Sequence, residues 1–318
     1  MNNSTKKMIF ILMLLSTTIS MNSNNWMTMW ITLEMNMFMF IPLMTKKKMK
    51  DQPMKYLIVQ STSSSMMILS IIWNLTNEML LNQSILMVLS LSIKLGMAPF
   101  HIWVPQIMSK LSWNKCIIML TIMKITPMMI TSQMLKIKMM MLSMFMSLIT
   151  GSLGGIKQTS LKKMMAYSSI SNSSWMLSSF FLSKTISVIF MTTYSLLNFF
   201  LMKTLKKMSL IYINQISNFK SKENFNINLN MLSLSGLPPM LGFFPKWMIL
   251  KEIILLSTIL STIMILTSMI SMYFYIQMMS STLLSFSMKK KNMKKNKMFS
   301  SSSINLLGLT MIFLIKSI

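Results

Sequence analysis

The sequence predicts an all-α fold, a polytopic bundle of about eleven transmembrane helices, with two helices broken near residues 96–99 and 236–245. Three observations carry this prediction. Hydrophobic residues make up 53% of the 318 residues and charged residues only 11%, a balance that points away from a soluble domain. The charges gather in clusters between apolar runs of about 17–25 residues, the length of helix that spans a bilayer. Finally, more than half of the few glycines and prolines stand inside two of those runs.

The apolar runs predict the helices in order along the chain. The first run is short and follows Lys6 and Lys7, so a signal peptide is the alternative for it. No small-residue cleavage site follows it and the second run begins almost at once, which favours a helix. We expect one transmembrane domain over 1–318, with a first half at 1–155 and a second half at 156–318. The predicted helices are 8–21, 26–44, 56–73, 84–104, 116–134, 139–154, 164–182, 186–202, 229–249, 254–280 and 302–317.

The distribution of lysine tests the number of spans. All 31 basic residues are lysine, against five acidic residues, and the net charge is +26. With eleven spans, 23 lysines fall in the N-terminal tail and in every second loop, whereas five fall on the opposite side. A helix missed or added in mid-chain would destroy this asymmetry. It therefore supports the number of spans, and it predicts an N-terminus on the positive side of the membrane and a C-terminus on the other.

Glycine and proline, with 7 and 8 residues in the whole chain, predict where helices break. Proline removes a backbone donor and clashes with the preceding turn, so we expect free carbonyl and amide groups at mid-membrane depth. Lipid cannot satisfy those groups, so the breaks must face protein or water, as in transporters built from repeats. Simple helix kinks are the alternative. The residues that predict the breaks are Gly96, Pro99 and Pro105 in "GMAPFHIWVP" and Gly236, Pro238, Pro239, Gly242 and Pro245 in "GLPPMLGFFP".

Four ionisable side chains lie deep in otherwise apolar spans: Glu34, Lys94, Lys124 and Lys246. A charge at that depth is costly, so it normally faces a bundle interior or water. Burial favours the neutral form of such a group, and an opposite charge nearby restores the charged form. A group held between these two influences can gain and lose protons near neutral pH. We therefore predict that these four residues form a proton relay.

Glu34 is the one acidic residue placed centrally in a predicted span, so it is the natural partner of a buried lysine. We choose Lys94 as that partner; a static ion pair that only fixes helix packing is the alternative. For Lys246, the alternative is a side chain that reaches from a helix end to the interface. His101 follows the first break and is a further candidate for the relay, or else an interfacial histidine.

Composition also excludes several classes of protein. Nucleic-acid sites favour arginine forks and exposed aromatic residues on one basic face, whereas these lysines stand at helix ends, so we expect no nucleic-acid partner. One cysteine, Cys116, and one histidine leave no ligand set for iron–sulfur clusters, haem or zinc. No dinucleotide fingerprint or phosphate loop occurs. We expect no metal and no cofactor in this chain.

Several stretches resemble a known family: "LEMNMFMFIPLM", "KLGMAPFHIWVPQIM", "SWNKCIIMLTIMKITPMMI", "GSLGGIKQTSLKKMMAYSSISNSSWML" and "LSLSGLPPMLGFFPKWMI". Over about residues 20–280 they resemble the mitochondrially encoded subunit 2 family of NADH dehydrogenase, in its arthropod form. These are antiporter-like membrane subunits of respiratory complex I, the proton-pumping NADH:ubiquinone oxidoreductase. The animal form lacks three helices of its larger relatives, which leaves eleven. Relatives carry histidine or a similar residue near Asn172, and often arginine in place of Lys162.

The resemblance implies roles for the buried charges. Glu34 corresponds to the glutamate of a Lys/Glu pair, and Lys94 to its partner on the first broken helix. Lys124 corresponds to the central relay lysine and Lys246 to the lysine of the second broken helix. The implied chemistry is proton translocation coupled to electron transfer that takes place in other subunits.

The resemblance also implies partners and a location. FMN, iron–sulfur clusters and ubiquinone are expected in partner subunits. The partners are expected to be lipids and other membrane subunits of complex I, including further antiporter-like ones. The location implied is the mitochondrial inner membrane, with the N-terminus on the matrix side and the C-terminus on the intermembrane side.

Two other functions stay open. One is a free-standing cation/proton antiporter of the same fold, although a metal-selective exchanger would be expected to place carboxylates at a break, and neither break has one. The other is a structural membrane scaffold, which does not explain four costly buried charges.

Overall fold

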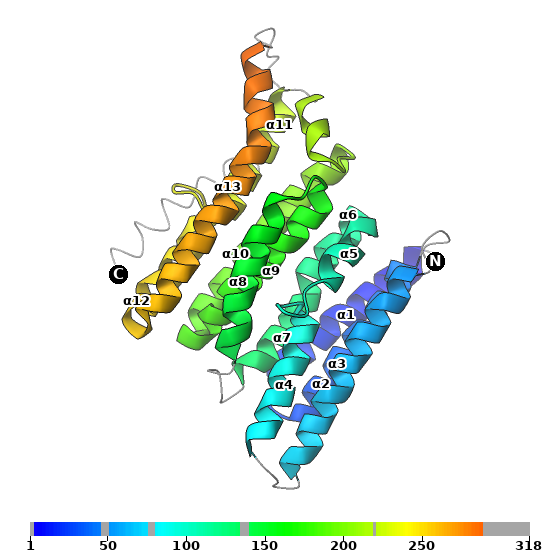
Figure 1. Ribbon diagram of the computed structural model, residues 1–318. Helices are drawn as coiled ribbons and strands as arrows, with labels where there is room; N and C mark the ends of the chain where they lie inside the picture. Colours follow the sequence, from blue (N-terminus) through cyan, green and yellow to red (C-terminus); the bar gives the residue numbers. More distant parts are fainter. Residues whose placement is uncertain (1–2, 46–50, 76–79, 134–139, 219–220, 289–318) are drawn as a thin grey trace. The chain divides into compact units, whose positions relative to one another are not determined.

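The computed structural model describes residues 3–45, 51–75, 80–133, 140–218 and 221–288, which form thirteen α-helices and one short 3-10 helix (Figure 1). Ten of the eleven predicted spans coincide with these helices, and the eleventh, 302–317, lies outside the described residues. The all-α prediction is confirmed. The elements are α1 (Asn3–Asn22), α2 (Trp26–Met44), α3 (Asp51–Leu75), α4 (Leu80–Leu95), α5 (Trp103–Lys110), α6 (Trp113–Leu120), α7 (Ile122–Ser132), α8 (Met141–Ile156), α9 (Leu161–Leu182), α10 (Lys184–Lys207), η2 (Ile213–Asn218), α11 (Ser221–Ser235), α12 (Phe243–Leu256) and α13 (Thr258–Met288).

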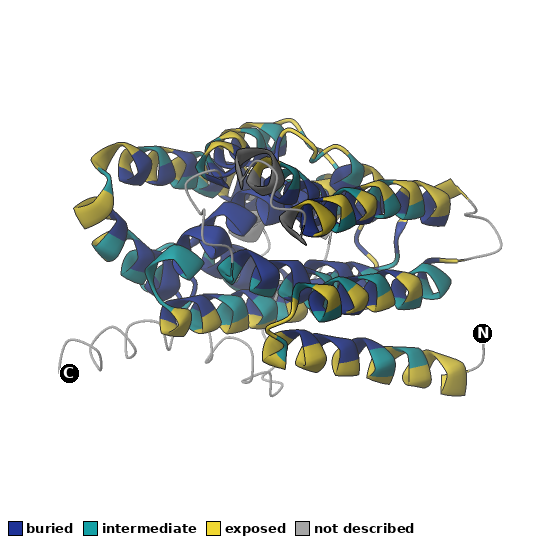
Figure 2. Ribbon diagram, turned by 90° about the horizontal axis from the view of Figure 1, so that it is seen from below, coloured by how far each residue is buried: buried dark blue, intermediate teal, exposed yellow. Residues whose placement is uncertain are grey.

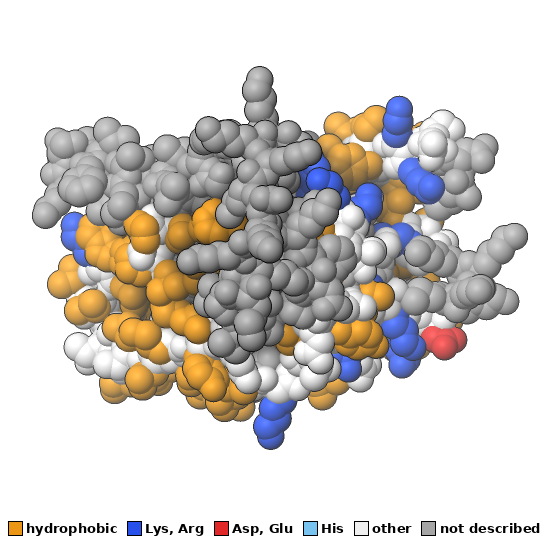
Figure 3. All heavy atoms as spheres, turned by 90° about the horizontal axis from the view of Figure 1, so that it is seen from above, with side chains coloured by type: hydrophobic (Ala, Val, Ile, Leu, Met, Phe, Trp, Pro, Cys, Tyr) orange, Lys and Arg blue, Asp and Glu red, His pale blue; other side chains and the backbone are white. Residues whose placement is uncertain are grey.

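The outer faces of these helices suit a membrane. Most helices bury one face and expose another (Figure 2), and the exposed faces carry large apolar side chains, among them Leu142, Leu255 and Ile259. On the face shown in Figure 3, such side chains cover much of the described surface. Water would penalise this exposure and lipid does not. Five described stretches are long and apolar enough to cross a bilayer, which makes this a multi-pass membrane protein: Trp26–Met44, Asp51–Trp73, Trp113–Ser132, Lys184–Lys207 and Thr258–Ser280.

The chain divides into two compact units, Met1–Ser147 and Leu148–Ile318. In the first unit, α7 packs against α1, α2, α4 and α6, and α2 also packs against α3. Helix α7, which carries Lys124, has no exposed residue. Helix α2, which carries Glu34, packs against its neighbours on one face and exposes the other. The predicted halves at 1–155 and 156–318 stay a prediction.

In the second unit, α9 is the enclosed helix. It packs against α10 and α12, and it is buried over most of its length although it is rich in serine. Six of the seven serine hydroxyls are satisfied within the helix, because each of the six donates to a carbonyl three residues earlier, as Ser169 does to Ala166 and Ser173 to Ile170. A polar composition is thus compatible with the centre of this unit.

Both predicted breaks are present and share one local structure. Helices α4 and α11 each end at a glycine in the left-handed region, Gly96 with φ +66° and Gly236 with φ +83°. The second amide after each helix closes the end, because Met97 N donates to the carbonyl of Ser92 and Leu237 N to that of Leu232. This is the Schellman arrangement, in which glycine carries the positive φ without strain.

The chain resumes its helix in the same way after each break. Helices α5 and α12 both begin seven residues beyond the glycine, and each has a proline, Pro105 or Pro245, as its third residue. A proline in the first turn leaves no helical hydrogen bond unmade, since those amides have no partner within the helix. The recurrence supports the interpretation of the two breaks as parts of a repeat.

The structure contains a third interruption that sequence reasoning missed. The span predicted at 116–134 is divided at Thr121, whose φ and ψ of −111° and −80° separate α6 from α7. The Thr121 hydroxyl donates to the carbonyl of Ile117. Because neither glycine nor proline stands at this position, the pattern that revealed the other breaks gave no signal here.

Candidate functional site

The first unit brings Glu34 and Lys94 together as an ion pair. Glu34 lies on α2 and Lys94 in the last turn of α4, and Lys94 Nζ is 3.8 Å from Glu34 Oε1. Their side chains are only 4% and 13% exposed, for Lys94 and Glu34 respectively. A separation of 3.8 Å is longer than a direct hydrogen bond, so the attraction is Coulombic and no bond geometry locks the two groups.

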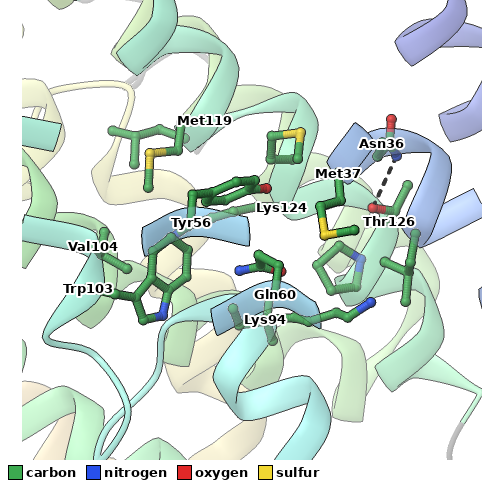
Figure 4. Close-up of a pocket in the computed structure, with 15 residues that line it drawn as sticks. Asn36, Met37, Tyr56, Gln60, Lys94, Trp103, Val104, Met119, Lys124 and Thr126 are labelled. Atoms are coloured by element: carbon green, nitrogen blue, oxygen red, sulfur yellow. Dashed lines mark hydrogen bonds between the residues drawn. The ribbon is translucent and has the colours of Figure 1, made fainter. Parts of the chain in front are cut away.

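A small cavity of about 30 Å³, lined mostly by apolar side chains with a few polar ones among them, lies beside this pair (Figure 4). Lys94 and Lys124 both line it, from α4 and α7, together with Tyr56 and Gln60 of α3. Roughly 10–15 Å³ of such space is enough for one water molecule where polar partners are present. The cavity can therefore place water between groups that exchange protons.

A polar network from three helices adjoins the cavity, and sequence reasoning did not select it. Ser16 of α1 donates to Asn36 Oδ1 at 2.5 Å, and Asn36 Nδ2 donates to Thr126 Oγ1 at 3.3 Å. Asn36 follows Glu34 by two residues and Thr126 follows Lys124 by two. A polar residue so close in sequence to a buried charge is a signal that it belongs to the site. The signal is weak because asparagine, serine and threonine are common throughout the chain. The network fixes α2 against α1 and α7 and so holds the cavity wall.

Aromatic residues pack against the start of the first break. Trp103, the first residue of α5, donates from Nε1 at 3.2 Å to the carbonyl of Ile93, which also accepts from Gly96 N, and so ties α5 to the end of α4. Its ring lies 5.9 Å from that of Tyr56, which in turn makes an edge contact with Phe40. This packing covers the start of the break, whereas Phe100 and Ile102 farther along it are exposed. That a break faces protein or water stays a prediction.

The second unit holds Lys246 in a comparable place. Lys246 Nζ donates to the carbonyl of Ser235, the last residue of α11, at 3.0 Å, and it lies 5.6 Å from the centre of the Trp175 ring. A cation at the C-terminal end of a helix is favoured by the free carbonyls and by the helix dipole. Lys246 is 8% exposed, so it does not reach an interface as a snorkelling side chain would.

His101 lies within the first break, between α4 and α5, and is half-buried. It is not among the residues that line the cavity of Lys94 and Lys124. The structure thus groups Glu34, Lys94 and Lys124 in one unit and places Lys246 in the other. The described residues contain no group of three or more histidine, cysteine, aspartate or glutamate side chains that could hold a metal ion.

The chain is similar to known proteins over most of its length. Residues 23–271 match the family model described as NADH:quinone oxidoreductase/Mrp antiporter, transmembrane. NADH-ubiquinone oxidoreductase chain 2 of Locusta migratoria is 35% identical over 300 residues, which cover 89% of this chain and 86% of the relative. The protein of the same name from Anopheles gambiae is 34% identical over 312 residues, covering 93% and 90%.

The fold is also shared with a solved structure. A chain of respiratory complex I from Thermus thermophilus superposes with a TM-score of 0.82 and 17% identity, covering 98% of this chain and 79% of that one. At this identity the likeness shows the fold alone. It includes the bundle of helices that positions the buried charges.

Proposed function

The chain belongs to the NADH-ubiquinone oxidoreductase chain 2 family, and we propose that it translocates protons as a membrane subunit of NADH:ubiquinone oxidoreductase, complex I. One observation carries the proton-translocating role. The Glu34–Lys94 ion pair lies beside a small cavity that Lys124 also lines, deep in a membrane protein. Charges placed there without function would be a cost to the fold.

The geometry supports a relay mechanism. While Glu34 and Lys94 lie together, each supplies the counter-charge of the other. If electron transfer in neighbouring subunits draws the pair apart, the Lys94 ammonium loses its counter-charge and releases its proton to water in the cavity, from which Lys124 accepts it. Lys246 performs a corresponding step in the second unit, where the carbonyl of Ser235 holds its ammonium. Each lysine gains and loses one proton, and no electron passes through this chain.

The cofactors of the complex would belong to other subunits. The sequence offers one cysteine and one histidine, a donor set that suits neither iron–sulfur clusters nor haem. FMN, iron–sulfur clusters and ubiquinone would then be bound by partner subunits. Among those partners we place other antiporter-like membrane subunits, and lipid around the apolar outer faces. We propose no nucleic-acid partner.

The location follows from the family and from the lysine asymmetry. The family, with relatives from animals such as Locusta migratoria, supports the mitochondrial inner membrane as the site of this chain, and the loop lysines support its orientation. The N-terminus would lie on the matrix side, because lysine-rich loops remain on the side of insertion, and the C-terminus on the intermembrane side.

A second function, a free-standing cation/proton antiporter, is kept because the family model also covers Mrp antiporters. Isolation of the chain through an affinity tag distinguishes the two. We expect NADH:ubiquinone oxidoreductase activity to co-purify with it, and proton uptake in proteoliposomes to require NADH and quinone. A chain that purifies alone and exchanges Na⁺ or K⁺ for protons without NADH would overturn the proposal.

Replacing Lys246 by methionine is expected to reduce NADH-driven proton uptake by about tenfold or more in the assembled complex. A barrier raised by only ~1.4 kcal/mol already gives a tenfold loss, and methionine cannot carry a proton. Acidification of reconstituted vesicles measures the effect. The control is Lys251→Met, since Lys251 is exposed and follows Lys246 on α12. Equal uptake by the two variants would show that Lys246 only caps α11.

A further inference from the structure

The second unit holds a large pocket at one end of its helices. The pocket has a volume of about 590 Å³, within the range of about 300–1,000 Å³ that ligand sites occupy. It lies where α8 ends and α9 begins, and the turn after α10 and the second half of α13 complete it. The loops after α8 and after α10 are among those whose lysines mark the positive side of the membrane.

The lining of this pocket is polar outside and apolar inside. Its exposed lining residues all carry a polar group, as Thr159 and Asn214 do. Its buried lining residues are apolar, among them Met164 of α9 and Phe274 and Met278 of α13. A polar rim above an apolar floor fits an amphipathic ligand.

The polar rim favours an anion. Lys157 is the one charged residue among the described lining residues, and Lys162 and Lys163 follow it in the first turn of α9. No acidic residue stands between Glu78 and Glu223 in the sequence to neutralise these lysines. Lysine-rich pockets at this depth, between membrane helices, attract anionic lipid headgroups.

The start of α9 adds hydrogen-bond donors beside the rim. The N-terminus of a helix carries a partial positive charge and unpaired amides, which suits a phosphate group. Ser160, the N-cap residue of α9, makes no cap hydrogen bond with its side chain. Its Oγ atom is buried and has no hydrogen-bond partner within the part of the chain that the structure describes. Because a buried hydroxyl nearly always has a partner, this atom indicates a bound molecule at the start of α9.

The two loops that form the rim are tied together. Leu161 N donates to the carbonyl of Ile211 at 2.9 Å, and Ile213 N donates to the carbonyl of Thr159 at 3.2 Å. These backbone bonds hold the start of α9 against the turn that follows α10. The rim is therefore preformed, and a ligand can bind with little rearrangement.

Exposed apolar side chains lead along α8 to the pocket. Met146, Ile149 and Leu153 are all exposed, and their spacing of three and four residues puts them on one face of the helix. Lys157 follows Leu153 by four residues, just beyond the end of α8. The helix rises roughly 16 Å from Met146 to Lys157, close to half of the roughly 30 Å hydrocarbon core. One acyl chain can therefore lie along this face with its headgroup at Lys157.

We propose that this pocket binds an anionic phospholipid, with its phosphate between Lys157 and the start of α9 and an acyl chain along the outer face of α8. The ammonium group of a zwitterionic lipid would be repelled by the lysines, and a soluble anion would leave the apolar floor unfilled. The proposal rests on the part of the proposed function that surrounds the chain with lipid, and it gives one such lipid a defined site. It involves no proton transfer.

Photolabelling of the complete complex tests the site. The complex is reconstituted in phosphatidylcholine vesicles with a trace of phosphatidylglycerol that carries a diazirine on its acyl chain, and labelled peptides are located by mass spectrometry. We expect label within residues 146–164, reduced at least fivefold by excess unlabelled phosphatidylglycerol. Absence of label there would overturn the proposal. So would equal competition by added phosphatidylcholine, or by inorganic phosphate alone, which would indicate a site for any lipid or for a soluble anion.

Replacing Lys157 by glutamine is expected to reduce the label at least threefold without changing the amount of assembled complex, because Lys157 is exposed. Adding Ser160→Ala should reduce the label further. The matched control is Lys184→Gln, since Lys184 is an exposed lysine of the same unit that does not line the pocket. If Lys157→Gln takes as much label as the control, the phosphate does not lie at Lys157 and the proposal is wrong.

The lipid site and the proton relay fail separately. If Lys246→Met lowers proton uptake but the pocket takes no selective label, the proposed function stands and the lipid site is wrong. If the pocket takes selective label but Lys246→Met pumps normally, the lipid site stands and the role of Lys246 is wrong.

Discussion

Replacing Lys94 by methionine is expected to reduce NADH-driven proton uptake by about tenfold or more, with a smaller loss of assembled complex. The variant removes a proton carrier from the cavity that Lys94 and Lys124 line. It also leaves Glu34 without its counter-charge at 3.8 Å, and breaking a buried pair in this way costs about 3–5 kcal/mol unless the remaining group is neutralised. Proton uptake by reconstituted complex, set against the amount of complex on a native gel, measures both effects.

The double variant Lys94→Met with Glu34→Gln separates function from packing. With both charges removed, no uncompensated charge remains, so assembly should recover towards that of the unmodified protein while proton uptake stays low. Such non-additivity is expected of two residues in contact. Lys110→Met is the matched control, because Lys110 belongs to the same interrupted span but is exposed. Recovery of both assembly and pumping in the double variant would identify the pair as purely structural.

Replacing Gly242 by alanine is expected to destabilise the second unit by more than about 3 kcal/mol, the upper end of the usual cost of an overpacked core. A Cβ atom at this position would overlap the carbonyl oxygen of Ser233 in α11, which is backbone and cannot rotate away. We therefore expect little or no assembled complex. Native electrophoresis of membranes that contain the variant, with NADH dehydrogenase staining, gives the result.

Gly154→Ala is the control for that substitution. There an added Cβ would meet the ring of Tyr167, which is a half-buried side chain and can turn. Substantial assembly is expected for Gly154→Ala and not for Gly242→Ala. Similar amounts of complex in the two variants would show that the second break can widen. The close approach of Gly242 to the Ser233 carbonyl would then not be required for assembly.

The two helix breaks show what a few consecutive residues can predict about the fold. Gly96 and Gly236 mark the ends of α4 and α11 because a positive φ suits glycine, and Pro105 and Pro245 mark the first turns that follow. These are properties of a few consecutive residues, so they can be read without knowledge of the rest of the fold. Thr121 interrupts a helix equally well, but threonine has no comparable backbone preference and the pattern passed over it.

Only part of the candidate site could be predicted from the sequence. Glu34 was paired with Lys94 because it is the one acidic residue central to a predicted span, so the choice needed no coordinates. Asn36, Tyr56 and Gln60 around the cavity were missed. Polar residues of these kinds are spread through the chain, and nothing local distinguishes those that face the cavity from those that face a loop.

The sequence by itself determined the membrane class, the helices and the two breaks, because apolar length, lysine placement, glycine and proline act within one segment at a time. Tertiary structure decided the rest: that Lys246 meets the carbonyl of Ser235, and that the serine-rich α9 is the centre of its unit. Both facts depend on which helix faces pack together. The packing is settled by contacts between segments far apart in the chain.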